Sequence, residues 1–119
     1  MKTSSAKAKG RNLQKLVVYA LRTYYDMDNS LGDDCYEGDI QSIPMGMSSE
    51  DIKLSPLAKT KIPFNIECKA QEKLNIWSAL KQAETNSPEG RTPLLVFKRN
   101  RTRMYACLDF EDLLKLLTK

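Results

Sequence analysis

One segment of the chain alternates apolar and polar side chains, the pattern of a β-strand that buries one face. Within residues 62–70 the alternate positions are Phe64, Ile66 and Cys68 on one side and Asn65, Glu67 and Lys69 on the other. Because successive side chains of a strand point to opposite faces, Glu67 and Lys69 are expected on one face. The sequence therefore predicts a strand that presents a carboxylate and an ammonium group side by side.

Three other segments show helical periodicity: one before this strand, one directly after it, and one at the end of the chain. Residues 12–25, 74–85 and 109–117 carry apolar side chains at helical spacing. Trp77 lies on the apolar stripe of the second segment, so we expect it in the core. Asp109 is suited to cap the third helix. The sequence thus predicts three helices.

Further strands are predicted between these helices. Short candidates lie at residues 35–36 and 40–43, and a clearer one at 51–54 ends at Ser55–Pro56. The apolar run 94–97 predicts a strand buried on both faces, with residues 104–108 as its hairpin partner. The resulting order is α-β-β-β-α-β-β-α, an α/β fold with a mixed central sheet flanked by helices.

The length of 119 residues fits one domain, which we expect over residues 11–119 behind a flexible basic arm at residues 1–10. No apolar run approaches the roughly 20 residues that span a bilayer, and the polar N-terminus has no signal-peptide pattern. We expect a cytoplasmic protein without a membrane partner.

Composition narrows the possible chemistry. The chain has no histidine, which excludes Ser-His and Cys-His nucleophilic pairs and imidazole-based zinc sites. Its three cysteines are widely spaced and predict reduced thiols. The net charge of +4 modestly favours a polyanionic partner. Carboxylates and lysines must carry any catalysis, and no organic cofactor is indicated.

Three side chains form the candidate catalytic set: Asp51, Glu67 and Lys69. They converge if the strands at 51–54 and 62–70 are antiparallel neighbours. Two carboxylates on rigid strands can hold a hard cation such as Mg²⁺, which neutralises a phosphate and activates water. The alternative is a solvated sheet face with a cross-strand ion pair.

The chain contains the segment Ser48-Ser49-Glu50-Asp51-Ile52 and, further on, the segment Glu67-Cys68-Lys69-Ala70-Gln71-Glu72-Lys73-Leu74-Asn75-Ile76-Trp77. Together these segments resemble the PD-(D/E)xK nuclease superfamily, in particular its small phage-encoded Holliday junction resolvase-like members. The resemblance implies a restriction-endonuclease-like core. It implies that Asp51, Glu67 and the main-chain carbonyl of Cys68 bind Mg²⁺ or Mn²⁺, with Lys69 beside the attacking water. It also implies a homodimer that acts on branched DNA in recombination, in the host cytosol if the protein is phage-encoded.

Three glutamines are possible additional site residues. Resolvase-like members carry a glutamate on the first helix as a further metal ligand, whereas residues 1–25 contain no acid, and Gln14 is the neutral residue that could replace it. Gln71 and Gln82 could contact a phosphate or a metal-bound water, although plain exposed glutamines are the alternative.

Basic residues predict a surface for DNA. They lie in the N-terminal segment and in the loop 98–103, and comprise Lys7, Lys9, Arg11, Lys98, Arg99, Arg101 and Arg103. A solvated hairpin tip is the alternative for the loop.

Three hypotheses follow. The first is a divalent-metal-dependent endonuclease that hydrolyses DNA phosphodiester bonds, with branched DNA as its substrate. The second is a DNA-binding module with a nuclease-like fold and weak or no catalysis, motivated by the missing acid on the first helix. The third is a protein-interaction domain whose charge is incidental.

Overall fold

The alternating segment around Glu67 is a strand at one edge of a three-stranded sheet. The computed structural model describes residues 3–44 and 50–119. Strand β3 (Phe64–Ala70) pairs in parallel with β4 (Thr92–Lys98), and β4 pairs antiparallel with β5 (Tyr105–Cys107). The predicted hairpin of β4 and β5 is therefore confirmed, and β3 is connected to β4 by a helix, as a parallel pair requires.

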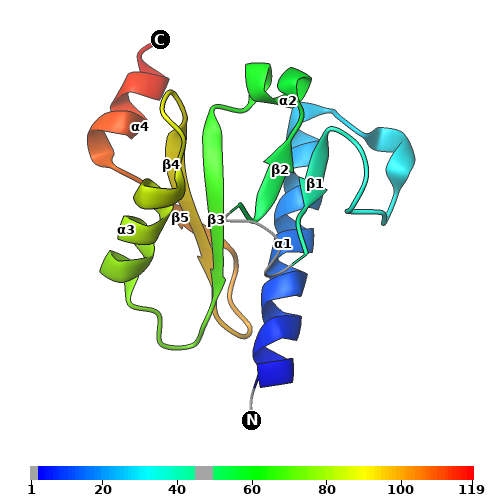
Figure 1. The fold of residues 1–119 in the computed structure, drawn as a ribbon, viewed down its shortest axis with the longest axis vertical. Helices are drawn as coiled ribbons and strands as arrows, with labels where there is room; N and C mark the ends of the chain where they lie inside the picture. The colour runs from blue at the N-terminus through cyan, green and yellow to red at the C-terminus, as the bar shows by residue number, and fades with distance from the viewer. Residues whose placement is uncertain (1–2, 45–49) are drawn as a thin grey trace.

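A second sheet stands beside the first (Figure 1). It consists of β1 (Ile40–Ser42) and β2 (Ile52–Leu54), which pair antiparallel. The expectation of one central sheet was wrong for the described residues, because β2 and β3 belong to different sheets. The reason lies at Cys68, whose main-chain N–H is taken by the side chain of Asp51 and not by a carbonyl group of β2.

Within the described residues, four α-helices complete a mixed α/β fold: α1 (Thr3–Tyr25), α2 (Pro56–Lys61), α3 (Ile76–Asn86) and α4 (Phe110–Leu117), with a short 3-10 helix η1 (Asn29–Leu31). Helix α1 already begins at Thr3, so residues 3–10 are helical and not the expected flexible arm. Alanine and lysine in this stretch are strong helix formers, which explains the extension. Helix α2 was not predicted; Ser55 caps it, and Pro56 takes its first position.

The two faces of the three-stranded sheet differ in what covers them. Ile66 and Val96 belong to the main core together with Leu13 and Val17 of α1. On the other face, Leu95 is fully buried and α3 packs against β3 and β4. The register pairs Glu67 with Leu95, so Glu67 lies on the face that α3 covers.

Two predictions about single segments were wrong. Trp77 was expected in the core, but its side chain is 82% exposed, because the small residues Ala79 and Ala83 form the buried side of α3. The short strand expected at residues 35–36 is absent, since this segment makes no ladder, although Cys35 itself is buried.

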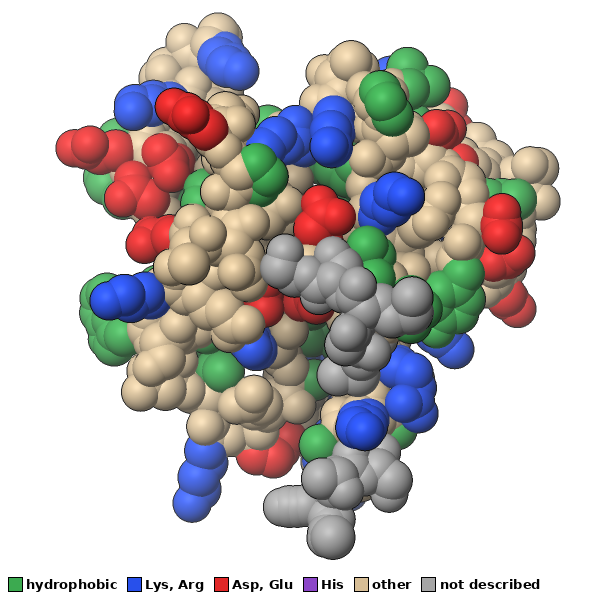
Figure 2. All heavy atoms as spheres, viewed as in Figure 1, with side chains coloured by type: hydrophobic (Ala, Val, Ile, Leu, Met, Phe, Trp, Pro, Cys, Tyr) green, Lys and Arg blue, Asp and Glu red, His purple; other side chains and the backbone are tan. Residues whose placement is uncertain are grey.

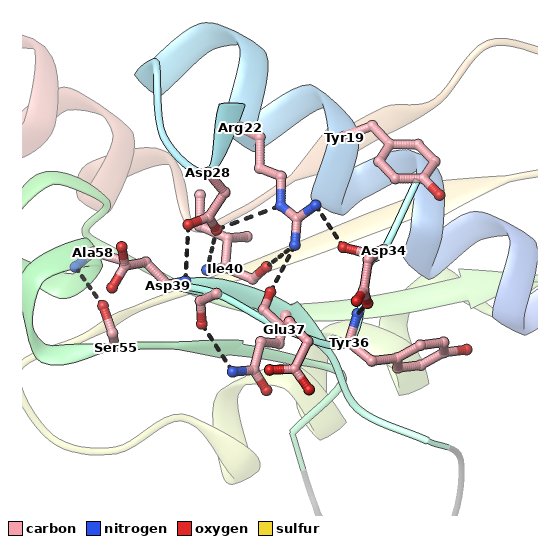
Figure 3. Close-up of polar contacts among 12 residues, drawn as sticks. Tyr19, Arg22, Asp28, Asp34, Tyr36, Glu37, Asp39, Ile40, Ser55 and Ala58 are labelled. Carbon is pink, nitrogen blue, oxygen red and sulfur yellow. Dashed lines mark hydrogen bonds and ion pairs between the residues drawn. The ribbon is translucent and has the colours of Figure 1, made fainter. Parts of the chain in front are cut away.

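A buried arginine joins the end of α1 to the beginning of β1 (Figure 3). The Arg22 guanidinium donates hydrogen bonds to the main-chain carbonyls of Asp34, Glu37 and Ile40, and its Nε lies 3.4 Å from Oδ2 of Asp28. The Asp28 carboxylate in turn accepts from the N–H groups of Asp39 and Ile40. This network places β1, which positions β2 and the residue before it, Asp51.

Among the residues that the structure describes, no helix has the length and apolar character needed to cross a membrane.

Candidate active site

Asp51 directly precedes β2 and reaches across to β3. Its main-chain carbonyl accepts a hydrogen bond of 3.0 Å from Ile43, which continues the pairing of β1 and β2. Its side-chain Oδ2 accepts a hydrogen bond of 2.7 Å from the main-chain N–H of Cys68. The Asp51 carboxylate is thereby held at the edge of β3, next to the residues on either side of Cys68.

Glu67 and Lys69 share one face of β3, as the alternating pattern predicted. The Glu67 side chain is 6% exposed and the Lys69 side chain 22% exposed, and Lys69 Nζ lies 3.8 Å from Glu67 Oε2. Burial makes this contact more than a solvated surface ion pair. The structure thus brings two of the three expected residues into direct contact and places the third against the residue between them.

Asn86 is a site residue that the sequence did not reveal. It is the last residue of α3, and its Nδ2 lies 3.5 Å from Oε1 of Glu67 as a long hydrogen-bond donor. In the sequence it looked only like part of a helix end. No local pattern links it to Glu67, because α3 brings the two together only by packing on the sheet.

Burial weakens the ionisation of both acids. Desolvation raises the pKa of Asp51, and the hydrogen bond from Cys68 and the charge of Lys69 partly oppose that rise. Desolvation also raises the pKa of Glu67, and the nearby Asp51 carboxylate raises it further, against the smaller effects of Asn86 and Lys69. The Asp51 carboxylate thus lies near enough to Glu67 for its negative charge to raise the pKa of Glu67. Such a pair stabilises a cation between its members.

The donor set fits one hard divalent cation with most of its water retained. Mg²⁺ is typically held by one or two carboxylates and keeps several waters, which matches Asp51 and Glu67. Within residues 3–44 and 50–119, no group of three or more acidic, cysteine or histidine side chains could enclose a metal.

The three glutamines lie in different environments. Gln14 is buried on α1, and its Oε1 accepts a hydrogen bond of 2.8 Å from the hydroxyl of Ser42, the β1 residue that pairs with Ile52. Gln71 is exposed just beyond the end of β3, and Gln82 is exposed on α3. Among the described contacts, none joins Gln71 or Gln82 to Asp51 or Glu67.

The two basic segments, far apart in the sequence, meet at one end of the molecule. Lys9 of α1 lines the same hollow, of about 140 Å³, as Lys98 and Arg99 of the β4–β5 connection. Four further basic residues, close in sequence to Lys9 or to Arg99, are exposed: Lys7, Arg11, Arg101 and Arg103. Figure 2 shows Lys and Arg side chains around this lower end of the face. The fold therefore brings three of the predicted DNA-binding residues, Lys9, Lys98 and Arg99, together near the ends of β3 and β4.

No protein-family model, curated protein or solved structure is significantly similar to the chain. The function must therefore be argued from the geometry of the site.

Proposed function

We propose that the protein is a divalent-metal-dependent endonuclease that hydrolyses phosphodiester bonds of DNA. One observation carries the proposal: the Asp51 carboxylate is bound to the N–H of Cys68, directly between Glu67 and Lys69 on β3. Two desolvated carboxylates and an ammonium group at one strand edge form a set suited to phosphate chemistry. The basic end formed by Lys9, Lys98 and Arg99 gives the DNA backbone a surface to bind.

A restriction-endonuclease-like core is part of the proposal. The order of elements supports it: a first helix, the strand carrying Glu67, a helix, and a parallel strand with its hairpin partner. Strands β2 and β3 belong to different sheets, which differs from the continuous mixed sheet that the resemblance implies. The side chain of Asp51 bridges the two sheets, so the acidic residues still meet at the edge of β3.

Three groups of this chain would hold the metal: the carboxylates of Asp51 and Glu67 and the main-chain carbonyl of Cys68. In an extended strand, the N–H and C=O groups of one residue point to the same edge. Because the N–H of Cys68 points to Asp51, its carbonyl points to that edge as well. Bound Mg²⁺, or Mn²⁺ in its place, supplies charge neutralisation at the phosphate and a more acidic water.

Lys69 and Asn86 act on the groups around the reacting phosphate. The Lys69 ammonium lies beside Glu67 and is partly open to solvent, so it is placed to orient the attacking water or to stabilise the charge on the phosphate. Asn86 donates to one oxygen of Glu67 and lowers the pKa of that carboxyl group, against the larger effect of burial. Asn86 is therefore a positioning residue.

The test is a cleavage assay over a panel of DNA structures. Four-way junction, flap and linear duplex DNA are incubated with the protein in Mg²⁺ and, separately, in Mn²⁺. We expect cleavage of branched DNA, which Glu67→Gln and Lys69→Ala abolish while binding in EDTA is retained. Glu84→Gln, which changes an exposed carboxylate on α3, is the matched control and should cut normally. Inert wild-type protein with every substrate and both metals would refute the enzyme.

A DNA-binding module with weak or no catalysis is the second candidate. It is favoured by the lack of an acid on the first helix: Gln14 is the neutral residue that could replace that acid, and its amide oxygen is engaged with Ser42. This candidate predicts that Asp51→Asn leaves DNA binding unchanged and that the parent protein does not cut. The homodimer and the cytoplasmic, phage-related setting remain predictions; sedimentation equilibrium measures the first.

A further inference from the structure

A shallow groove of about 490 Å³ opens near the proposed active site. It runs along the carboxyl ends of β3 and β4 and is lined by the segment 71–74, the first turn of α3, and β5. Its volume lies within the range of small-molecule sites, and open α/β sheets commonly bind ligands at the carboxyl ends of their parallel strands. The endonuclease proposed above does not by itself account for this groove.

Two aromatic rings form one wall of the groove. The ring centroids of Phe97 and Tyr105 are 6.3 Å apart with planes inclined at 34°, so they make a tilted pair and not a closed stack. The Tyr105 side chain is 56% exposed. An exposed ring of this kind offers a flat surface on which a planar heterocycle can stack.

Part of the rim of the groove is basic. Three basic residues, Lys73, Lys98 and Arg99, line the groove, and among its described lining residues Glu72 is the one acid. The Glu72 carboxylate is already engaged, because its Oε2 accepts a hydrogen bond of 2.7 Å from the main-chain N–H of Asn100. The rim therefore suits an anionic group, while the aromatic wall suits an uncharged ring.

The groove is adjacent to the proposed catalytic residues and on the same side of the sheet. Phe97 is the register partner of Lys69, so the two side chains share the face that also bears Glu67. Gln71, at the mouth of the groove, follows Glu67 by four positions, which is roughly 13 Å along an extended strand. This corresponds to about four base pairs of DNA rise.

We infer that this groove receives an unpaired nucleotide of the DNA substrate, with its base on Tyr105 and Phe97 and its phosphate at the basic rim. A paired base cannot use the aromatic wall, because both of its faces are stacked within the duplex. An apolar peptide would bring no anionic group to the three cations of the rim. The inference rests on the proposed function and specifies its substrate: DNA with an unpaired nucleotide a few positions from the cut.

The test measures stacking directly, without cleavage. A duplex with one extrahelical 2-aminopurine, and a fully paired duplex with 2-aminopurine at the same position, are titrated with the full-length protein in EDTA. Stacking on Tyr105 should quench the extrahelical probe on binding and leave the paired probe unchanged. By anisotropy, Tyr105→Leu should weaken binding of the extrahelical duplex about tenfold, which is the loss of one base-aromatic stack.

Tyr24→Leu is the matched control, because Tyr24 is 88% exposed near the far end of α1. It should retain both the quenching and the affinity. Equal fluorescence changes for the two duplexes with wild-type protein would overturn the inference, whether or not Tyr105→Leu folds. Quenching without cleavage in Mg²⁺ or Mn²⁺ would retain the groove and reject the nuclease, whereas cleavage without selective quenching would do the reverse.

Discussion

The carboxylate of Asp51 accepts a hydrogen bond of 2.7 Å from the main-chain N–H of Cys68. This contact replaces a rung of β-ladder at the edge of β3 and brings a buried acid beside Glu67, the residue before Cys68. Burial raises the pKa of both acids. The site therefore holds two carboxylates whose ionised forms are destabilised until a cation joins them.

Removing one of these charges should stabilise the metal-free protein. Because the folded-state pKa of Glu67 is raised above the ordinary value of 4.5, the native state binds more protons than the unfolded state in the interval above that value. Stability should fall as pH rises through this interval. Glu67→Gln should flatten the dependence and raise Tm at neutral pH by about 2–5 °C. Thermal melts in EDTA between pH 4 and 8 measure this effect; a lower Tm for Glu67→Gln at pH 7 would contradict it.

A divalent cation should stabilise the wild-type protein through the same two acids. Ligands that bind only the native state raise Tm with concentration, and at about 100 times the dissociation constant the gain is about 2.7 kcal/mol. We expect Mg²⁺ and Mn²⁺ to raise the wild-type Tm and to leave Asp51→Asn unchanged. Glu84→Gln should respond like wild type. An equal shift in all three proteins would place the cation elsewhere.

As the pH is lowered, catalysis should be lost at a higher pH than the ordinary pKa values of carboxyl groups would give. Both acids must be ionised to hold the cation, and burial raises both pKa values. The acid limb of kcat/KM should therefore lie above the ordinary value of 4.5 for a glutamate. Replacing Asn86 with alanine removes a group that lowers the pKa of Glu67. The acid limb of the pH profile should therefore move to still higher pH. If the acid limb of Asn86→Ala is the same as that of the wild-type protein, Asn86 does not act on Glu67.

Arg101→Gly should separate DNA binding from folding. Arg101 has a φ of 66°, a left-handed conformation that glycine adopts without strain. The variant should keep or slightly raise Tm, while its affinity for DNA falls about threefold to tenfold and the salt slope decreases by about one unit. Anisotropy across a series of salt concentrations gives both values. Undiminished affinity would exclude the hairpin from the DNA surface.

Gly38→Ala should destabilise the protein by about 2–4 kcal/mol. Gly38 has a φ of 94°, and an added Cβ would lie 2.7 Å from Cγ of Asp28. That carboxylate cannot move easily, because Arg22 and the N–H groups of Asp39 and Ile40 hold it. Gly90→Ala is the control, since its φ is 87° but no atom lies within 4 Å of the added Cβ. If denaturant unfolding shows equal losses of stability for Gly38→Ala and Gly90→Ala, the close approach of the added Cβ to Asp28 is not the cause.

Local patterns in the sequence determined much of the fold and one face of the site. Period-two alternation placed Glu67 and Lys69 together, and the apolar run in β4 predicted burial on both faces, which Leu95 and Val96 confirm. Asp109 caps α4 as expected. These features depend on spacing over a few residues, and short-range geometry transmits that spacing directly into structure.

Tertiary packing decided the rest. Only packing placed Asp51 on the N–H of Cys68, Asn86 against Glu67, and Lys9 beside Arg99, because each pair joins segments that no local period relates. It also left Trp77 exposed, since small alanines let α3 pack closely on the sheet and turned its apolar stripe away from the expected face. The sequence thus identifies the candidate side chains, whereas tertiary packing brings them together, because their convergence depends on how buried surfaces fit one another.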